Sequence, residues 1–253
     1  MMFGLEFPPI ENLVVWPEAF EGSGFNKIAL INVIALLGTA AIMVLGAGKK
    51  EMVPRGIQAV AEGVVDFINV QVIHPTIGTD KKALSYGPLL LALFLFIFFT
   101  NIFEIIPVFQ MPANARMANP LLLALLVYFF WIGVTLKHHG VKGITGMLIP
   151  PGVPGPLLLL MVPIEFLSNF VIRPFSHAVR LFANMLAGHI LLVTFGVLCI
   201  SVWALSPIIV VEALTFPVLV ALTAFEAMVA FLQAYIFTIL SGVYIGSALH
   251  PDH

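Results

Sequence analysis

The chain has 253 residues, of which 60% are hydrophobic and only 9% charged, and its mean hydropathy is +1.08. A soluble domain of this size has no interior large enough for so much apolar sequence, so the composition predicts an all-α polytopic membrane protein. The net charge of −2 gives no reason to expect nucleic acid as a partner, and the single Cys199 excludes an intramolecular disulfide.

The first 73 residues divide into three segments. Residues 1–25 hold four glutamates and three prolines but no Lys or Arg, which predicts an exposed arm. Residues 28–46 form an apolar segment of the length that a bilayer crossing requires. Residues 54–73 predict an amphipathic helix, on the membrane surface or packed across it, because apolar and polar side chains segregate at helical spacing. The apolar positions are Ile57, Val60, Val64, Phe67, Ile68 and Val72, and the polar ones are Arg55, Glu62, Asp66 and Asn69.

Residues 88–107 and 120–136 predict two further spans, separated by a polar loop with Arg116. Residues 137–142, which include His138 and His139, read as a solvated loop rather than a metal site. The proline-rich residues 149–156 predict a linker. Two long apolar tracts follow, residues 157–200 and 205–248, with a break at residues 201–207. Together the segments predict one membrane domain with five membrane-embedded helices.

The basic residues orient these spans. Seven of them fall on one side (Lys49, Lys50, Arg55, Lys81, Lys82, Lys137 and Lys142), against Lys27 and Arg116 on the other. Because basic residues favour the cytoplasmic side, the N-terminus is expected outside and the C-terminus in the cytoplasm.

Each long tract can be read in two ways. A helix of about 40 residues is about 60 Å long, twice the hydrocarbon thickness. Each tract is therefore either a hairpin of two short spans or one helix inclined far from the membrane normal. A hairpin in the first tract would turn at Arg173–Pro174, where no Gly, Asn or Asp turn cluster exists. A single inclined helix with an irregularity near Pro174 is favoured.

Arg180 lies near the middle of the first tract. A permanent cation at membrane depth costs at least about 2.5–3.5 kcal/mol, so such a residue is expected to face a partner or a watered path. At helical spacing it shares a stripe about 120° wide with six other polar residues, while His189 falls on the opposite face. Those six are Glu165, Asn169, Arg173, Ser176, His177 and Asn184.

The second tract carries a line of polar residues on one face: Glu212, Glu226 and Gln233. Buried carboxylates in a membrane are expensive unless they are paired or reached by water. A line of carboxylates beside a helix with His and Arg is typical of a proton or ion pathway.

At these residues the chain resembles subunit a of the F-type ATP synthases. The resemblance is carried by Arg180-Leu-Phe-Ala-Asn184-Met-Leu-Ala-Gly188-His189, by Glu226, and by Leu232-Gln233-Ala-Tyr-Ile-Phe. It extends to Asn101-Ile-Phe-Glu-Ile-Ile-Pro107 and Pro112-Ala-Asn-Ala-Arg116. The family fold is five membrane-embedded helices plus an amphipathic one, with the last two steeply inclined around a rotating c-ring.

The resemblance implies a role for each matching residue. Arg180 would separate two aqueous half-channels that carry protons to and from the ring carboxylate. His189 and Glu226 match a pair on the proton pathway, and Asn184 and Gln233 match polar positions at the ring-facing site. Glu165 resembles an acidic half-channel position, although it precedes Pro174 by nine residues, one more than in many members. The remaining pathway candidates are Glu212, His177 and Arg173.

The resemblance also implies the setting. It implies a multi-pass subunit of a bacterial plasma membrane with the c-ring, peripheral stalk subunit b and the other synthase subunits as partners. No cofactor and no metal are expected. No phosphate loop or nucleophile motif occurs in the sequence, so nucleotide chemistry would belong to partner subunits.

Each of these residues can instead have a purely structural role. Arg180 can be a structural cation bonded to helix-end carbonyls, and Arg173 can reach to an interface. His177 can hydrogen-bond a neighbour, and His189 with Glu226 can form a buried polar contact. Three others can be structural as well: Asn169 in helix packing, and Glu104 and Glu212 at the membrane interface. The rival functions are an ion-coupled secondary transporter, although no internal repeat is present, and a structural subunit of a respiratory complex.

Overall fold

A computed structural model describes residues 26–46, 55–106, 109, 111–149, 155–204 and 209–249 of the chain. Within these ranges all regular structure is helical. The elements are α2 (Lys27–Gly46), α3 (Ile57–Ile68), η1 (Asn69–Ile73), α4 (His74–Thr76), α5 (Lys81–Leu84), α6 (Gly87–Ile102), η2 (Ala113–Ala115), α7 (Ala118–Leu148), α8 (Gly155–Leu167), η3 (Ser168–Ile172), α9 (Arg173–Ala204) and α10 (Ile209–Leu249). The expected arm at residues 1–25 lies outside the described residues, as do residues 250–253.

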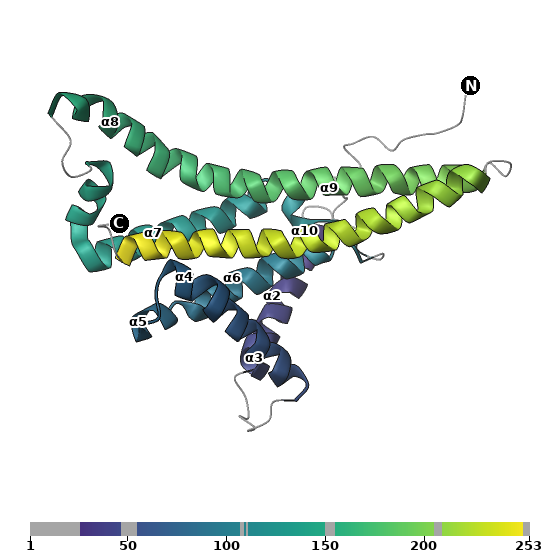
Figure 1. The fold of residues 1–253 in the computed structure, drawn as a ribbon, viewed down its shortest axis with the longest axis horizontal. Coiled ribbons are helices and arrows are strands. Elements are labelled where there is room, and N and C mark those ends of the chain that lie inside the picture. Colours follow the sequence, from purple (N-terminus) through teal and green to yellow (C-terminus); the bar gives the residue numbers. More distant parts are fainter. Residues whose placement is uncertain are drawn as a thin grey trace.

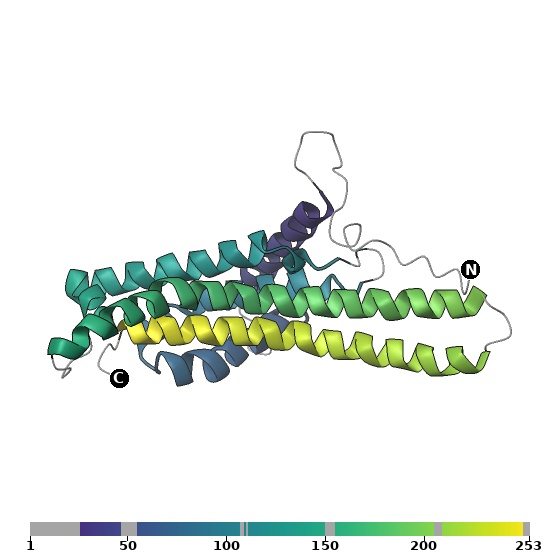
Figure 2. The same cartoon turned by 90° about the horizontal axis from the view of Figure 1, so that it is seen from above.

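Helices α9 and α10 form a long antiparallel pair along one side of the molecule (Figures 1 and 2). Helices α2 to α7 gather against the C-terminal half of α10 and the first half of α9. The other halves of α9 and α10 project beyond this bundle. One broad face of the pair therefore carries no other element of the described chain.

Five helical segments in the described residues are long and apolar enough to cross a membrane: Lys27–Gly46, Lys81–Ile102, Ala118–Leu148, Leu157–Ile200 and Thr215–Leu249. The all-α polytopic class and the five expected spans are confirmed. The predicted amphipathic helix is present as α3 and η1, and it packs against α2 and α6. Its inner residues Ile68 and Val72 are buried in the main apolar core, whereas Ile57 and Val60 stay exposed.

Two predicted boundaries were wrong. The span expected at residues 88–107 ends at Ile102, and the next residues form tight turns in which Glu104 N–H donates to the carbonyl of Asn101 at 3.1 Å. The span expected to end at Leu136 continues to Leu148, so residues 137–142 are not a loop. Polar residues can continue a helix past the apolar span. The helix is kinked at Gly140, whose φ of 61° is a backbone conformation that other residues rarely adopt.

The first long tract is one continuous helical run, α8–η3–α9, and its irregularity lies where it was expected. Pro174 has no N–H to donate and its ring crowds the preceding turn. The five residues Ser168–Ile172 accordingly form a π-helix that ends directly before Arg173–Pro174. A π-helical turn accommodates one extra residue, which matches the longer spacing between Glu165 and Pro174. The same arrangement recurs at η1, directly before His74–Pro75.

The break expected at residues 201–207 was placed too early, because α9 continues to Ala204. Residues 205–208 lie outside the described residues, and α10 begins at Ile209. The predicted linker at residues 149–156 overlaps α8, which begins at Gly155. Pro156 fits there because the first turn of a helix needs no N–H donor from it.

Candidate functional site

Arg180 lies on the face of α9 that no other described element covers. Its side chain is exposed within this chain, as are those of nearby residues at helical spacing. These neighbours are mainly small or apolar: Ile172, Phe175, Ser176, Ala183, Asn184, Ala187 and Leu191. A permanent cation in the middle of an apolar face is costly in lipid, so this face is suited to a partner that carries a negative charge.

The polar stripe predicted around Arg180 is divided between two surfaces. Arg180, Ser176 and Asn184 are exposed, whereas His177 and Asn169 are each 3% exposed and face the bundle. The prediction placed all of these residues on one face of the helix because it assumed a regular α-helix. The π-helical turn at Ser168–Ile172 changes the rotation of every residue before it, and His177 lies at the edge of the stripe, where α7 and α10 cover it.

Asn184 connects the exposed face to α10. Its side-chain amide donates a hydrogen bond of 2.8 Å to Oε1 of Gln233, which is 2% exposed. Gln233 therefore lies behind Asn184 rather than on the surface itself. The pair fixes the register of α9 against α10 one turn from Arg180.

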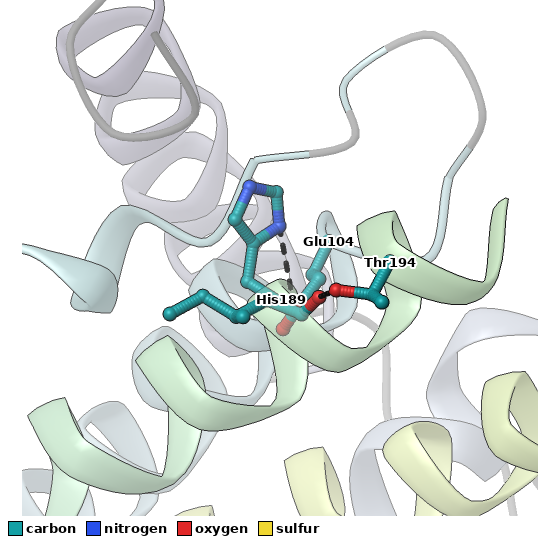
Figure 3. A network of polar contacts seen from close by, with 4 residues as sticks. Glu104, His189 and Thr194 are labelled. Atoms are coloured by element: carbon teal, nitrogen blue, oxygen red, sulfur yellow. Dashed lines mark hydrogen bonds and ion pairs between the residues drawn. The ribbon is translucent and has the colours of Figure 1, made fainter. Parts of the chain in front are cut away.

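On the opposite side of α9, His189 contacts a carboxylate from the turn after α6 (Figure 3). Its Nδ1 atom lies 3.6 Å from Oε1 of Glu104, and both side chains are buried. Thr194 lies about one turn farther along α9, where its hydroxyl donates to the carbonyl of Ile190 at 2.6 Å. Glu104 was expected at the membrane interface; the structure shows that its side chain, on the tight turns after α6, is buried within the protein.

Glu226 completes this group from α10. Its carboxylate occupies the space in which a Cβ atom on Gly188 would lie, so it packs against the α9 backbone beside His189. It is also close enough to Glu104 for the two carboxyl groups to interact electrostatically. Its Oε2 atom has no hydrogen-bond partner among the described residues. Three titratable groups from α9, α10 and the turn after α6 thus meet; we name Glu104, His189 and Glu226 the acid–histidine cluster.

An asparagine network lies beside the turn that carries Glu104. The side-chain amide of Asn114 donates to Oγ1 of Thr100 at 2.9 Å and to Oδ1 of Asn101 at 2.6 Å. Asn119 donates to Asn114 at 2.8 Å and to Asn32 at 3.2 Å. These bonds join α2, α6, η2 and α7, and they satisfy buried polar groups that are costly to leave unpaired. Sequence reasoning missed this network.

The remaining predicted residues lie toward the other end of α9. The guanidinium of Arg173 lies 5.8 Å from the ring centres of both Trp131 and Tyr244, a cation–π arrangement on both. Glu165 accepts a hydrogen bond of 3.1 Å from Asn169, which also donates to the carbonyl of Met147 in α7. The side chain of Glu212 lies outside the described residues.

The site therefore has an exposed cation on one face of α9 and a buried acid–histidine cluster on the other. Carboxyl and imidazole groups exchange protons, whereas guanidinium does not. The described residues contain no group of three or more His, Cys, Asp or Glu side chains arranged to hold a metal ion. The chemistry available to these residues is proton transfer.

Comparison with known proteins gives a consistent result. The model of the family described as "ATP synthase A chain" matches residues 28–246. A protein of Pseudarthrobacter chlorophenolicus named ATP synthase subunit a is 36% identical over 232 residues, which are 90% of this chain and 86% of that protein. Relatives with the same name in Frankia alni and Arthrobacter sp. are 39% and 35% identical, over 90% and 98% of this chain and 79% and 93% of their own lengths.

Proposed function

This chain belongs to the ATP synthase A chain family, and we propose that it is the proton-conducting stator subunit of an F-type ATP synthase. As a subunit of that complex it has no enzymatic activity of its own. Two offset half-channels would deliver protons to a c-ring carboxylate and remove them, with Arg180 between the two. The observation that carries this proposal is the exposed Arg180 on one face of α9 with the acid–histidine cluster buried behind it.

Protons are taken up through the acid–histidine cluster. The proposed orientation has the N-terminus outside and the C-terminus in the cytoplasm, so the turn after α6 lies at the outer side. Glu104 lies on that turn and contacts His189, and Glu226 lies on the adjoining surface of α10. A proton taken up from outside passes through these groups to the ring. Glu212, also on α10, belongs to the same path.

Arg180 acts as an electrostatic gate. A ring carboxylate that approaches it is stabilised as the anion, so its proton is released toward the cytoplasm. The guanidinium cannot give up its own proton, which prevents a direct leak between the half-channels. Moving one charge through about 100 mV is worth about 2.3 kcal/mol, and this free energy drives rotation. Asn184 and Gln233 hold the ring-facing surface in register.

Arg173, His177 and Glu165 lie between Arg180 and the proposed cytoplasmic end, and they belong to the release path. The partners of the subunit are the c-ring on the exposed face of α9 and α10, peripheral stalk subunit b, the other synthase subunits and the lipid of a bacterial plasma membrane. The two long helices are steeply inclined, because the span Leu157–Ile200 alone has 44 residues, or about 66 Å of helix at 1.5 Å per residue.

Substitution of Arg180 tests the proposal. The assembled complex with Arg180→Ala, in phospholipid vesicles, should lose both ATP-driven proton pumping and proton-driven ATP synthesis, while ATP hydrolysis by the catalytic subunits persists. Arg55→Ala, which removes an exposed cation elsewhere, is the matched control and should retain both activities. Proton-driven ATP synthesis that survives in Arg180→Ala would refute the gate.

A further inference from the structure

A small cavity lies between α7, α9 and α10, apart from the acid–histidine cluster. Its lining includes Ala124, Tyr128 and Trp131 of α7, Arg173 and His177 of α9, and Tyr244 of α10. The volume open to the centre of a water-sized sphere is about 10 Å³. This is about the space that one water molecule needs.

Two of the residues that line this cavity each have a buried nitrogen atom without a hydrogen-bond partner among the described residues: Nε1 of Trp131 and Nε2 of His177. The side chains are 2% and 3% exposed. An indole N–H only donates, and Nε2 of a neutral imidazole can accept when Nδ1 carries the hydrogen. Leaving such buried groups unpaired is costly, so both are suited to one water molecule that accepts from Trp131 and donates to His177.

The side chain of His177 has little freedom to find another partner. Its ring lies 3.9 Å from that of Phe237 and 5.7 Å from that of Tyr244, centre to centre, both on α10. The other titratable or charged groups that face it are Arg173, Tyr128 and Tyr244 around the cavity, and Arg180 one turn along the same helix. None of these is a carboxylate that could replace the water as a partner for Trp131.

We propose that this cavity binds one water molecule, bridging Nε1 of Trp131 and Nε2 of His177, and that His177 with this water is a station where protons released near Arg180 pass toward the cytoplasm. The second half of this inference rests on the proposed function. The water site itself does not, because it follows from the cavity and the two nitrogen atoms.

Vibrational spectroscopy of the assembled synthase in phospholipid vesicles tests the water site. Ultraviolet resonance Raman spectra report whether an indole N–H is hydrogen-bonded, and the difference between wild type and Trp131→Phe isolates the signal of Trp131. The expected signal is that of a bonded N–H. It should change to that of a free N–H in Ala124→Val, where two added methyl groups fill the cavity. A free N–H in the wild type would overturn the water site.

His177→Gln separates water binding from proton transfer. Glutamine keeps a hydrogen-bond acceptor of similar reach but does not exchange protons near neutrality. The N–H of Trp131 should therefore stay bonded, while proton-driven ATP synthesis falls, by up to about 10²-fold for a lost proton-transfer group. Ala124→Val should lower ATP synthesis as well. Gly133→Ala adds a methyl group to α7 in open space and should change neither readout.

The outcomes distinguish the two proposals. A bonded N–H in the wild type, together with unchanged ATP synthesis in both Ala124→Val and His177→Gln, would overturn the role in proton release and leave the water site standing. Failure of the gate appears elsewhere, as ATP synthesis that survives in Arg180→Ala. If Ala124→Val does not assemble, the comparison of wild type with Trp131→Phe and His177→Gln decides both halves.

Discussion

The carboxylate of Glu226 on α10 lies against the Cα atom of Gly188 on α9, in the space that a Cβ atom at position 188 would need. No other residue type leaves this space open. The close approach of the two helices brings Glu226 beside His189, the next residue along α9. A glycine at this point therefore determines where one of the three groups of the acid–histidine cluster lies.

Gly188→Ala should displace the carboxylate of Glu226 and slow proton uptake. Misplacing a reacting group by about 1 Å can cost up to about 10²-fold in rate, and the added methyl group costs about 1–3 kcal/mol of packing. Proton-driven ATP synthesis in vesicles measures the effect. Gly196→Ala on the same helix adds a methyl group in open space and should be close to wild type. Equal activities of the two variants would contradict the placement of Glu226.

Adding Glu226→Asp to Gly188→Ala should restore part of the activity. Aspartate is one methylene shorter, so its carboxylate can withdraw from the new methyl group while it keeps its ability to exchange protons. A double variant that is less active than either single variant would show that space at Gly188 is not the constraint.

Glu104→Gln should slow proton uptake, because it keeps the size of the side chain and removes the exchangeable carboxyl proton. The contact of Glu104 with His189, at 3.6 Å, predicts a reduction of up to about 10²-fold in proton-driven ATP synthesis. Glu62→Gln, which changes an exposed glutamate of α3, is the control. If the two variants are equally active, Glu104 has only a structural part in the cluster.

Asn114→Ala should loosen the packing of α2, α6, η2 and α7 without changing the charge of the proposed pathway. It removes two donated hydrogen bonds and one accepted bond from a buried network. At about 0.5–1.5 kcal/mol each, the loss for the three bonds is about 1.5–4.5 kcal/mol. The melting temperature of the assembled complex and the retention of this subunit in detergent measure it. Asn32→Ala, which removes only the peripheral bond of 3.2 Å, should have a clearly smaller effect.

The spans could be predicted from the sequence because their signal is local. Length and hydropathy identify a crossing, and the irregularity before Pro174 follows from a missing N–H donor. The ends of α6 and α7 were harder to predict. Apolar residues continue past Ile102 into tight turns, and polar residues past Leu136 remain helical. The polarity of the residues therefore shows where the membrane span lies, but not where the helix ends.

The site could be predicted only in part, for a related reason. Arg180, His189 and Glu226 stand out because each is polar inside an apolar tract. Glu104 does not, since it precedes Pro107 at the end of a span and has the sequence pattern of an interfacial residue. Its contact with His189 joins residues 85 positions apart, and helical spacing within one segment contains no information on such contacts. Trp131 was missed for the same reason.

The close packing of α10 on α4 supports a last prediction, on stability. A Cβ atom at Gly246 would collide with the backbone carbonyl of Thr76, and a backbone atom cannot move aside as a flexible side chain can. Gly246→Ala should therefore separate α10 from α4 and destabilise the subunit by about 1–3 kcal/mol or more. Gly63→Ala is the matched control, because position 63 is helical with open space around it. There alanine should be neutral or stabilise the helix by up to about 1 kcal/mol. Thermal melting of the assembled complex distinguishes the loss of stability expected for Gly246→Ala from the unchanged or higher stability expected for Gly63→Ala. A Gly246→Ala variant as stable as Gly63→Ala would contradict the contact between α10 and α4.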